Sequence, residues 1–311
     1  MPTLYTTGTI NQPDAGSVGL SMAEKIRDEV TTHEAWDLVE EFTAPTGTVR
    51  WYVFKCLAAQ SGLSSDFFVV MGRILSNGKL CFCICEDYNA ASHIMSYFPR
   101  YGSNSTVIWD NEGRNPQTST LSTTIWDGSS TQYWSWTPAG TSTKWWILVT
   151  EDQFTLAFNG PSNGFVHAGV YIPLSALTID MPLQIMGTEG SYSGSYGGIT
   201  RNPAVAGASS QAYAQGFYRN NTYLGFRGDL RYNDRLQGNQ RPVAEIGMVL
   251  SSSSGDEAIY GWALGKQKNI RAGNQSAPGF AFGDAYVLGG NLWVPYLPTD
   301  NWIWDTGIAS S

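Results

Sequence analysis

The sequence predicts an all-β protein: an antiparallel, jelly-roll-like β-sandwich with a second, smaller β domain and one short N-terminal helix. Three observations support this fold class. Short runs of β-branched and aromatic residues follow one another from residue 36 onward. Gly-containing turns separate them, and Asn77-Gly78 and Gly289-Gly290 are typical of two-residue hairpins, whose turn positions need a positive φ. One segment alone has the spacing of an amphipathic helix. Many short strands with Gly-rich turns indicate a sandwich or a barrel.

Residues 1–34 are expected to form an extended arm and the short helix. Residues 1–20 are mostly small and polar, and Ser21 and Glu24 have the spacing of a capping box. Two interpretations of the helix stay open: packing on its own domain, or docking on a neighbouring subunit. In the second case the arm lies on the neighbour and orders on assembly. The assembly interface would then use Leu4, Tyr5, Ile10, Met22, Ile26 and Val30.

The rest of the chain divides at a change of composition. Residues 35–187 carry the strands of the β-sandwich, including hairpins around Asn77-Gly78 and Glu151-Asp152. Residues 188–215 are dominated by Gly, Ser, Tyr and Ala, which predicts a long loop or linker. Strand-like runs return in residues 216–311, the expected C-terminal β domain.

Composition excludes some partners and favours others. The net charge is −8 and no long basic patch occurs, so nucleic acid is not an expected partner. No run of 18 apolar residues predicts a membrane-spanning helix, and the first residues do not resemble a secretion signal. Charged residues make up only 14% of the chain, against roughly 25% in average domains. Lys is scarce and aromatic residues reach 13%, as in surfaces that other proteins cover. A large sandwich with an aromatic core is the alternative explanation.

The four cysteines are expected to be buried, reduced side chains. Cys81, Cys83 and Cys85 alternate with apolar residues, so they should share one face of a strand. Neighbours on one strand face are awkward ligands for a single tetrahedral metal ion. With Cys56, they are better explained as small hydrophobic residues in a reducing compartment.

The sequence contains no recognisable catalytic motif, and no catalytic residue, cofactor or metal site is assigned. The histidines His33, His93 and His167 form no zinc-protease motif, and neither a nucleophile elbow nor a P-loop occurs. Four pairs of adjacent carboxylates remain: Glu40-Glu41, Glu86-Asp87, Glu151-Asp152 and Asp256-Glu257. Two pairs from different strands could flank a sugar, so a glycan hydrolase is the third functional hypothesis.

Tryptophans suggest a second hypothesis, a carbohydrate- or receptor-binding module. Trp134, Trp136, Trp145 and Trp146 lie close together in the sequence, and exposed tryptophans would form a platform for a glycan or a protein partner. The alternative is that these side chains belong to the core.

Three stretches resemble virion structural proteins of tailed bacteriophages, of the minor tail, baseplate or neck kind. They are residues 35–44, 144–160 and 283–293, and the likeness lies in composition and turn placement. The resemblance implies a non-enzymatic subunit that is made in the host cytoplasm and ends in the virion. Its partners would be copies of itself and other virion proteins, with a host-surface glycan for a tail-tip module. Assembly is therefore the leading functional hypothesis.

Overall fold

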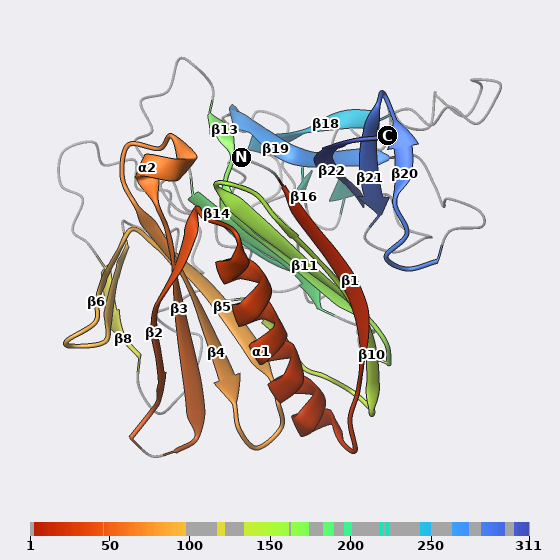
Figure 1. Cartoon of the computed structure of the whole chain (residues 1–311). Helices are drawn as coiled ribbons and strands as arrows, with labels where there is room; N and C mark the ends of the chain where they lie inside the picture. Colours follow the sequence, from red (N-terminus) through yellow and green to blue (C-terminus); the bar gives the residue numbers. More distant parts are fainter. Residues whose placement is uncertain are drawn as a thin grey trace.

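The computed structural model of the chain describes residues 3–45, 47–97, 117–121, 134–161, 163–173, 183–189, 196–200, 218–219, 222–223, 243–249, 263–273, 281–295 and 302–310. Two antiparallel sheets share one hydrophobic core, which confirms the predicted all-β, sandwich-like fold (Figure 1). A third sheet and a three-stranded sheet accompany them, and β16 (Tyr218–Arg219) pairs with β17 (Thr222–Tyr223).

The first main sheet, here the N-terminal sheet, has the order β2 (Trp36–Thr43), β3 (Val49–Cys56), β4 (Phe67–Ile74), β5 (Leu80–Cys85) and β9 (Trp134–Trp136). The second, the central sheet, has the order β1 (Leu4–Asn11), β10 (Ser142–Val149), β11 (Gln153–Asn159), β12 (Gly164–Val170), β14 (Leu183–Glu189) and β15 (Tyr196–Thr200). Most neighbouring strands also follow one another in the sequence. The two sheets are therefore meanders, not the jelly roll that we expected.

The main helix, α1 (Ala15–Thr32), starts six residues before the predicted capping box. Asp14 is its N-cap and accepts hydrogen bonds from the backbone N–H of Ser17 (2.8 Å) and from the Ser17 hydroxyl (2.9 Å). Ser21 lies inside the helix, where its hydroxyl accepts a hydrogen bond from Gln12. The second helix, α2 (Ala58–Ser61), is a single turn.

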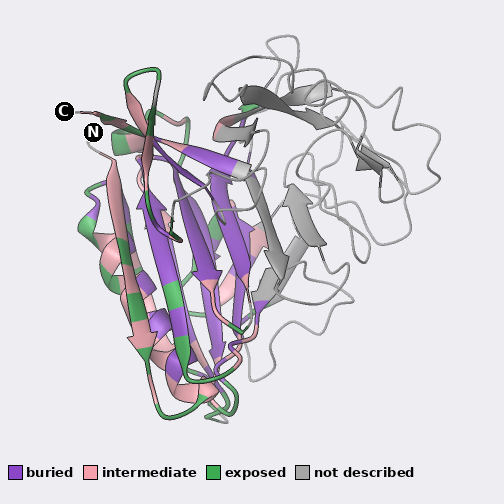
Figure 2. Ribbon diagram, turned by 90° about the vertical axis from the view of Figure 1, so that its right-hand side faces the viewer, coloured by how far each residue is buried: buried purple, intermediate pink, exposed green. Residues whose placement is uncertain are grey.

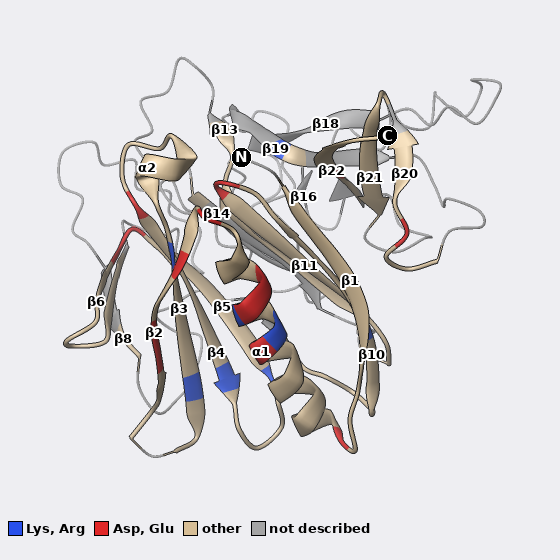
Figure 3. Ribbon diagram, viewed as in Figure 1, with Lys and Arg blue, Asp and Glu red and all other residues tan. Residues whose placement is uncertain are grey.

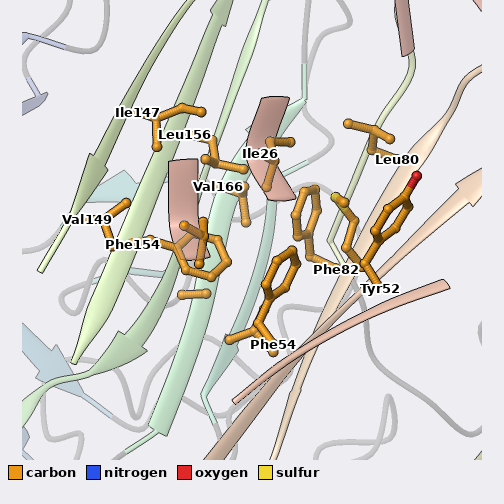
Figure 4. Packing of buried hydrophobic residues seen from close by; sticks show 14 of the residues in the cluster. Ile26, Tyr52, Phe54, Leu80, Phe82, Ile147, Val149, Phe154, Leu156 and Val166 are labelled. Carbon is orange, nitrogen blue, oxygen red and sulfur yellow. The ribbon is translucent and has the colours of Figure 1, made fainter. Parts of the chain in front are cut away.

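Helix α1 completes the sandwich core. Its buried side chains join inward-facing residues of both sheets in one cluster (Figure 4). The helix contacts β1, β10, β2 and β4, whereas β14 contacts β5 and β9 directly. The two sheets thus approach each other on one side, and α1 fills the space between them on the other (Figure 1).

The first strand, β1, corrects the expectation that the extended arm lies on a neighbouring subunit. All eight of its residues pair with β10 of the same chain, from Leu4 opposite Val149 to Asn11 opposite Ser142. The Thr-rich alternation of this segment is typical of a strand, although no strand was predicted here.

Both faces of the inner strands of the N-terminal sheet, β3, β4 and β5, are buried. Figure 2 faces the central sheet, whose strands β10, β11 and β12 are buried along most of their length. Phe82 and Ile84 point into the main core, whereas Cys81, Cys83 and Cys85, which are not in disulfide bonds, belong to a second cluster on the outer face of the N-terminal sheet. This confirms that the three cysteines share one face. Beside this sheet lies the small sheet of β6 (Asp87–Asn89), β7 (Ile94–Tyr97) and β8 (Gln117–Thr120).

Of the two hairpin turns expected from dipeptides, one has the predicted form. Gly289 and Gly290 have φ values of 61° and 87° and join paired strands directly. At Asn77-Gly78 only Gly78 has a positive φ, 73°. There the backbone N–H of Ile74 donates to Lys79, which closes a longer loop than the predicted turn.

The C-terminal sheet covers the outer face of the central sheet. Its order is β13 (Ile172–Pro173), β19 (Ala263–Gly273), β22 (Trp302–Ala309), β21 (Asn291–Pro295) and β20 (Tyr286–Leu288), and β18 (Val243–Val249) also pairs with β19. Trp304 packs edge-on against Trp146 and Phe165 of the central sheet, with centroid distances of 5.3 and 5.2 Å.

Two elements cross the expected domain boundaries. Strand β13 belongs to the segment expected in the sandwich, yet it pairs with β19. Strand β15 lies inside the expected linker of residues 188–215, yet it pairs with β14 as part of the central sheet. The Gly, Ser, Tyr and Ala content of residues 188–215 therefore did not prevent β15 from forming a strand. No helix in the described part of the chain is long and apolar enough to cross a membrane.

Candidate functional site

A β-bulge in β2 creates the first part of the candidate site. The register of β2 on β3 shifts between Leu38 and Glu40, so Val39 is the extra residue. Strict alternation from Trp36 and Leu38 would point Glu40 and Phe42 into the main core. The bulge turns both to the outer face of the N-terminal sheet, where Phe42 packs with the second cluster. Bulges commonly redirect a side chain in this way beside functional sites.

The β6–β7 hairpin supplies the other two residues. Tyr88 is the middle residue of β6, and His93 is the last residue of the turn that precedes β7. His93 has a φ of 53°, and it is the one described non-Gly residue with a positive φ. Its carbonyl oxygen accepts a hydrogen bond from the backbone N–H of Leu121. The hairpin thereby holds the His93 backbone in the left-handed region, which residues other than glycine adopt at an energetic cost.

The side chains of Glu40, Tyr88 and His93 converge at this place, and we call these three residues the Glu40 cluster. The Tyr88 hydroxyl donates a hydrogen bond to Glu40 Oε2 over 2.5 Å. His93 Nδ1 lies 3.2 Å from the same carboxylate oxygen and 3.3 Å from the Tyr88 hydroxyl. Phe42 stacks on the imidazole at a centroid distance of 4.0 Å and an interplanar angle of 18°. Four side chains from two strands and a turn therefore fix one another.

Burial and charge decide the protonation of the cluster. Burial, and then the hydrogen bond and negative charge of Glu40, raise the pKa of Tyr88 well above its usual range, so the phenol stays a neutral donor. The side chains of His93 and Glu40 are 37% and 21% exposed, so water reaches the cluster. Acidic residues lie along β2 in Figure 3. The His93 nitrogen and the Glu40 and Tyr88 oxygens thus lie together at a negatively charged place that solvent can reach.

The six residues predicted for an assembly interface belong to the chain's own fold. Met22, Ile26 and Val30 are fully buried in the main core. Leu4 and Ile10 pack against that core from β1, and the Tyr5 hydroxyl donates to the carbonyl of Gly283. The expectation that they contact a neighbouring subunit is corrected by this packing, because a narrow apolar stripe serves a core equally well.

The predicted tryptophan platform is mostly core as well. Trp136 and Trp146 are fully buried and Trp145 is 5% exposed. Trp136 stacks on Phe158 across the sandwich at 4.2 Å. The side chain of Trp134 lies outside the described residues. The three described tryptophans therefore offer no exposed face for a glycan.

Basic residues hold three of the carboxylates in the adjacent carboxylate pairs. Glu41 pairs with Arg27 and Arg50, and Lys268 binds Asp152 (2.6 Å) and Glu151 (3.1 Å). Asp256-Glu257 lies outside the described residues. The Lys268 contacts join β19 to the turn between β10 and β11, which is a structural role.

Sequence reasoning missed the Glu40 cluster. His93 and Glu40 lie 53 positions apart, and neither they nor Tyr88 belong to a recognisable motif. One signal was present: Glu40 interrupts the apolar alternation of Trp36, Leu38 and Phe42, which is a pattern that a bulge can explain.

Comparisons with known proteins leave the site to be interpreted from its own chemistry. No protein-family model matches the chain, and a search of curated proteins finds no match.

Proposed function

We propose that this chain is a non-enzymatic structural subunit that acts by assembling with copies of itself and with other proteins. Following the resemblance of residues 35–44, 144–160 and 283–293, the assembly is the virion of a tailed bacteriophage, in its tail, baseplate or neck. The two parts of this proposal have separate support and separate tests.

One observation supports assembly most directly: the large hydrophobic side chains that are exposed lie on strands at sheet edges. Among the described residues they are Val39 on β2 (40% exposed), Ile172 on β13 (40%) and Val287 on β20 (59%). Strand β2 is the first of the N-terminal sheet, and β13 and β20 are the two ends of the C-terminal sheet order. An edge strand offers unpaired backbone groups to another chain, and monomeric proteins usually protect such edges with charges or bulges. Strand β2 has both kinds of protection, whereas β20 contains no charged residue, so β20 is the edge that most favours assembly.

The composition agrees with this interpretation. Protein interfaces are depleted in Lys and Glu and rich in aromatic residues, as this sequence is. Strand addition at an edge combines backbone hydrogen bonds with apolar side-chain contacts, and the three exposed residues could supply the latter.

Replacing an exposed edge residue by Lys tests assembly. We expect the wild-type chain to sediment as an oligomer, and Val287→Lys to shift it toward the monomer, because a charge at an edge opposes pairing. Gln60→Lys, an exposed position on α2, makes a similar charge change away from the edges and should keep the wild-type size. A wild-type chain that remains monomeric at high concentration would contradict the proposal.

The virion assignment has its own test. Mass spectrometry of purified particles should find the chain in a fixed ratio to the major structural proteins. Oligomers in solution without the chain in particles would leave assembly standing and remove the phage part.

A further inference from the structure

We propose that the Glu40 cluster is a binding site for one divalent transition-metal ion, with Zn²⁺ as its representative. The ligands are Glu40 Oε2, His93 Nδ1 and the Tyr88 oxygen, and water completes the coordination. Tyr88 is a neutral phenol in the metal-free chain, and the charge of the bound cation stabilises its phenolate form. This site is independent of the assembly proposed above.

The distances between the donor atoms support this inference. Zinc holds nitrogen and oxygen ligands at about 2.0–2.1 Å, which places two tetrahedral ligands about 3.3 Å apart. The separations of His93 Nδ1 from Glu40 Oε2 and from the Tyr88 oxygen are 3.2 and 3.3 Å. The third separation, 2.5 Å, is a hydrogen bond. It would widen when the metal replaces the phenolic proton, which leaves to bulk water.

The charges also favour a cation. Glu40 accepts from the Tyr88 phenol and lies beside His93, and no Lys or Arg among the described residues pairs with it. Its neighbour Glu41, in contrast, is paired with Arg27 and Arg50. Imidazole, carboxylate and phenolate are the harder ligands that zinc and its neighbours in the first transition row accept. In the described part of the chain, no three His, Cys, Asp or Glu side chains form a group that could hold a metal ion. The proposed site therefore needs Tyr88 as its third protein ligand.

Supporting contacts hold the ligands in place before any metal binds. The bulge at Val39 points Glu40 outward, Phe42 stacks on the imidazole, and the turn fixes the backbone of His93. Because 37% of the His93 side chain is exposed, an ion can enter from solvent and keep water ligands. Ordered supporting contacts of this kind raise metal affinity at natural sites.

Isothermal titration of chelator-treated full-length chain with Zn²⁺ tests the site. We expect one ion per chain, and a loss of about tenfold or more in affinity for His93→Gly and Glu40→Gln. Glycine suits the positive φ of His93, and glutamine can still accept the Tyr88 hydrogen bond, so both variants should fold. Glu41→Gln removes the adjacent, Arg-paired carboxylate and should bind Zn²⁺ like the wild type.

A second measurement distinguishes Tyr88 coordination from binding elsewhere. Zn²⁺ should produce the ultraviolet difference absorption of an ionised tyrosine in the wild type, and Tyr88→Phe should abolish it. Circular dichroism reports whether each variant is folded. The proposal is overturned if the wild type does not bind Zn²⁺ saturably, or if folded His93→Gly and Glu40→Gln bind it with unchanged affinity. In that case the cluster is a hydrogen-bond network that ties β6 to β2.

Discussion

At the residue scale, His167 is a polar side chain that the outer face of the central sheet buries in its neutral form. It lies on β12, is completely buried, and its Nδ1 is 2.7 Å from the Thr155 hydroxyl on β11. Its Nε2 has no hydrogen-bond partner among the described residues. Burial lowers the pKa of His167 to about 3, so the folded chain holds the imidazole neutral.

Because His167 is buried in its neutral form, we expect the free energy of unfolding to fall in acid. The unfolded chain takes up the His167 proton near the ordinary pKa of about 6.5, whereas the folded chain resists it until about pH 3. Across that window the free energy of unfolding should fall by about 1.4 kcal/mol per pH unit from this group. His167→Gln cannot take up the proton, so its urea-unfolding free energy should depend less steeply on pH.

Thr155→Val provides the matched control. It removes the hydrogen-bond partner but leaves the buried imidazole, so it should lower stability at all pH values and keep the wild-type slope. Equal slopes for the wild type and His167→Gln would show that His167 is not the acid-sensitive group.

At the element scale, α1 depends on a close approach to the loop between β4 and β5. A Cβ atom added at Gly19 would lie 2.1 Å from the carbonyl oxygen of Gly78. Gly78 itself has a positive φ and would meet the backbone of Ala15 and Gly16. Two glycines facing each other thus allow the helix to sit against the loop while its apolar stripe reaches the core.

Gly19→Ala should therefore destabilise the protein, although alanine is the better helix former. The clash is with backbone, so the helix or loop must shift, at a cost of about 1–3 kcal/mol in the free energy of unfolding. Gly16→Ala, in the same helix, would meet the capping Asp14 carboxylate at 3.1 Å and backbone only at 3.9 Å, so it should destabilise the protein less than Gly19→Ala. Thermal unfolding of both variants measures the difference, and equal effects would contradict the packing argument.

Helix α1 shows which features could be predicted from the sequence and which could not. Its stripe of Met22, Ile26 and Val30 predicted its buried face, because helical periodicity is a local signal. Its start was missed because Ser21 and Glu24 imitate a cap, while two glycines weaken the propensity of the true first turns. Only packing against the Gly78 loop and the sheets explains why those turns are helical.

The candidate site was beyond sequence reasoning for a related reason. Strand-like runs from residue 36 onward could be predicted, since alternation is local. Glu40 reaches Tyr88 and His93 only because one extra residue, Val39, reverses the faces of the following residues. A single-residue register shift leaves almost no trace in composition, yet it decides which side chains meet.

At the scale of the whole molecule, the sheets are stacked in layers that share buried faces. The N-terminal sheet faces the central sheet across the main core. The central sheet in turn carries the C-terminal sheet on its outer face, through Trp304 and through the Lys268 contacts with Asp152. Burial raises the pKa of Asp152, even with the Lys268 ammonium beside it. The C-terminal strands are therefore docked through aromatic packing together with a partly buried ion pair.

Trp304 should be the anchor of that docking. It is completely buried between Trp146 and Phe165, so Trp304→Ala leaves a large cavity and should lower the free energy of unfolding by about 3–5 kcal/mol. Limited proteolysis should then cut first in the C-terminal sheet and leave a fragment that contains the two main sheets, because their shared core does not include Trp304. Ala309→Ser changes an exposed residue of β22 in the same C-terminal sheet and should stay within about 0.5 kcal/mol of the wild type. If Trp304→Ala kept wild-type stability and protease resistance, the C-terminal sheet would have to be held by other contacts, with Lys268 as the next residue to replace.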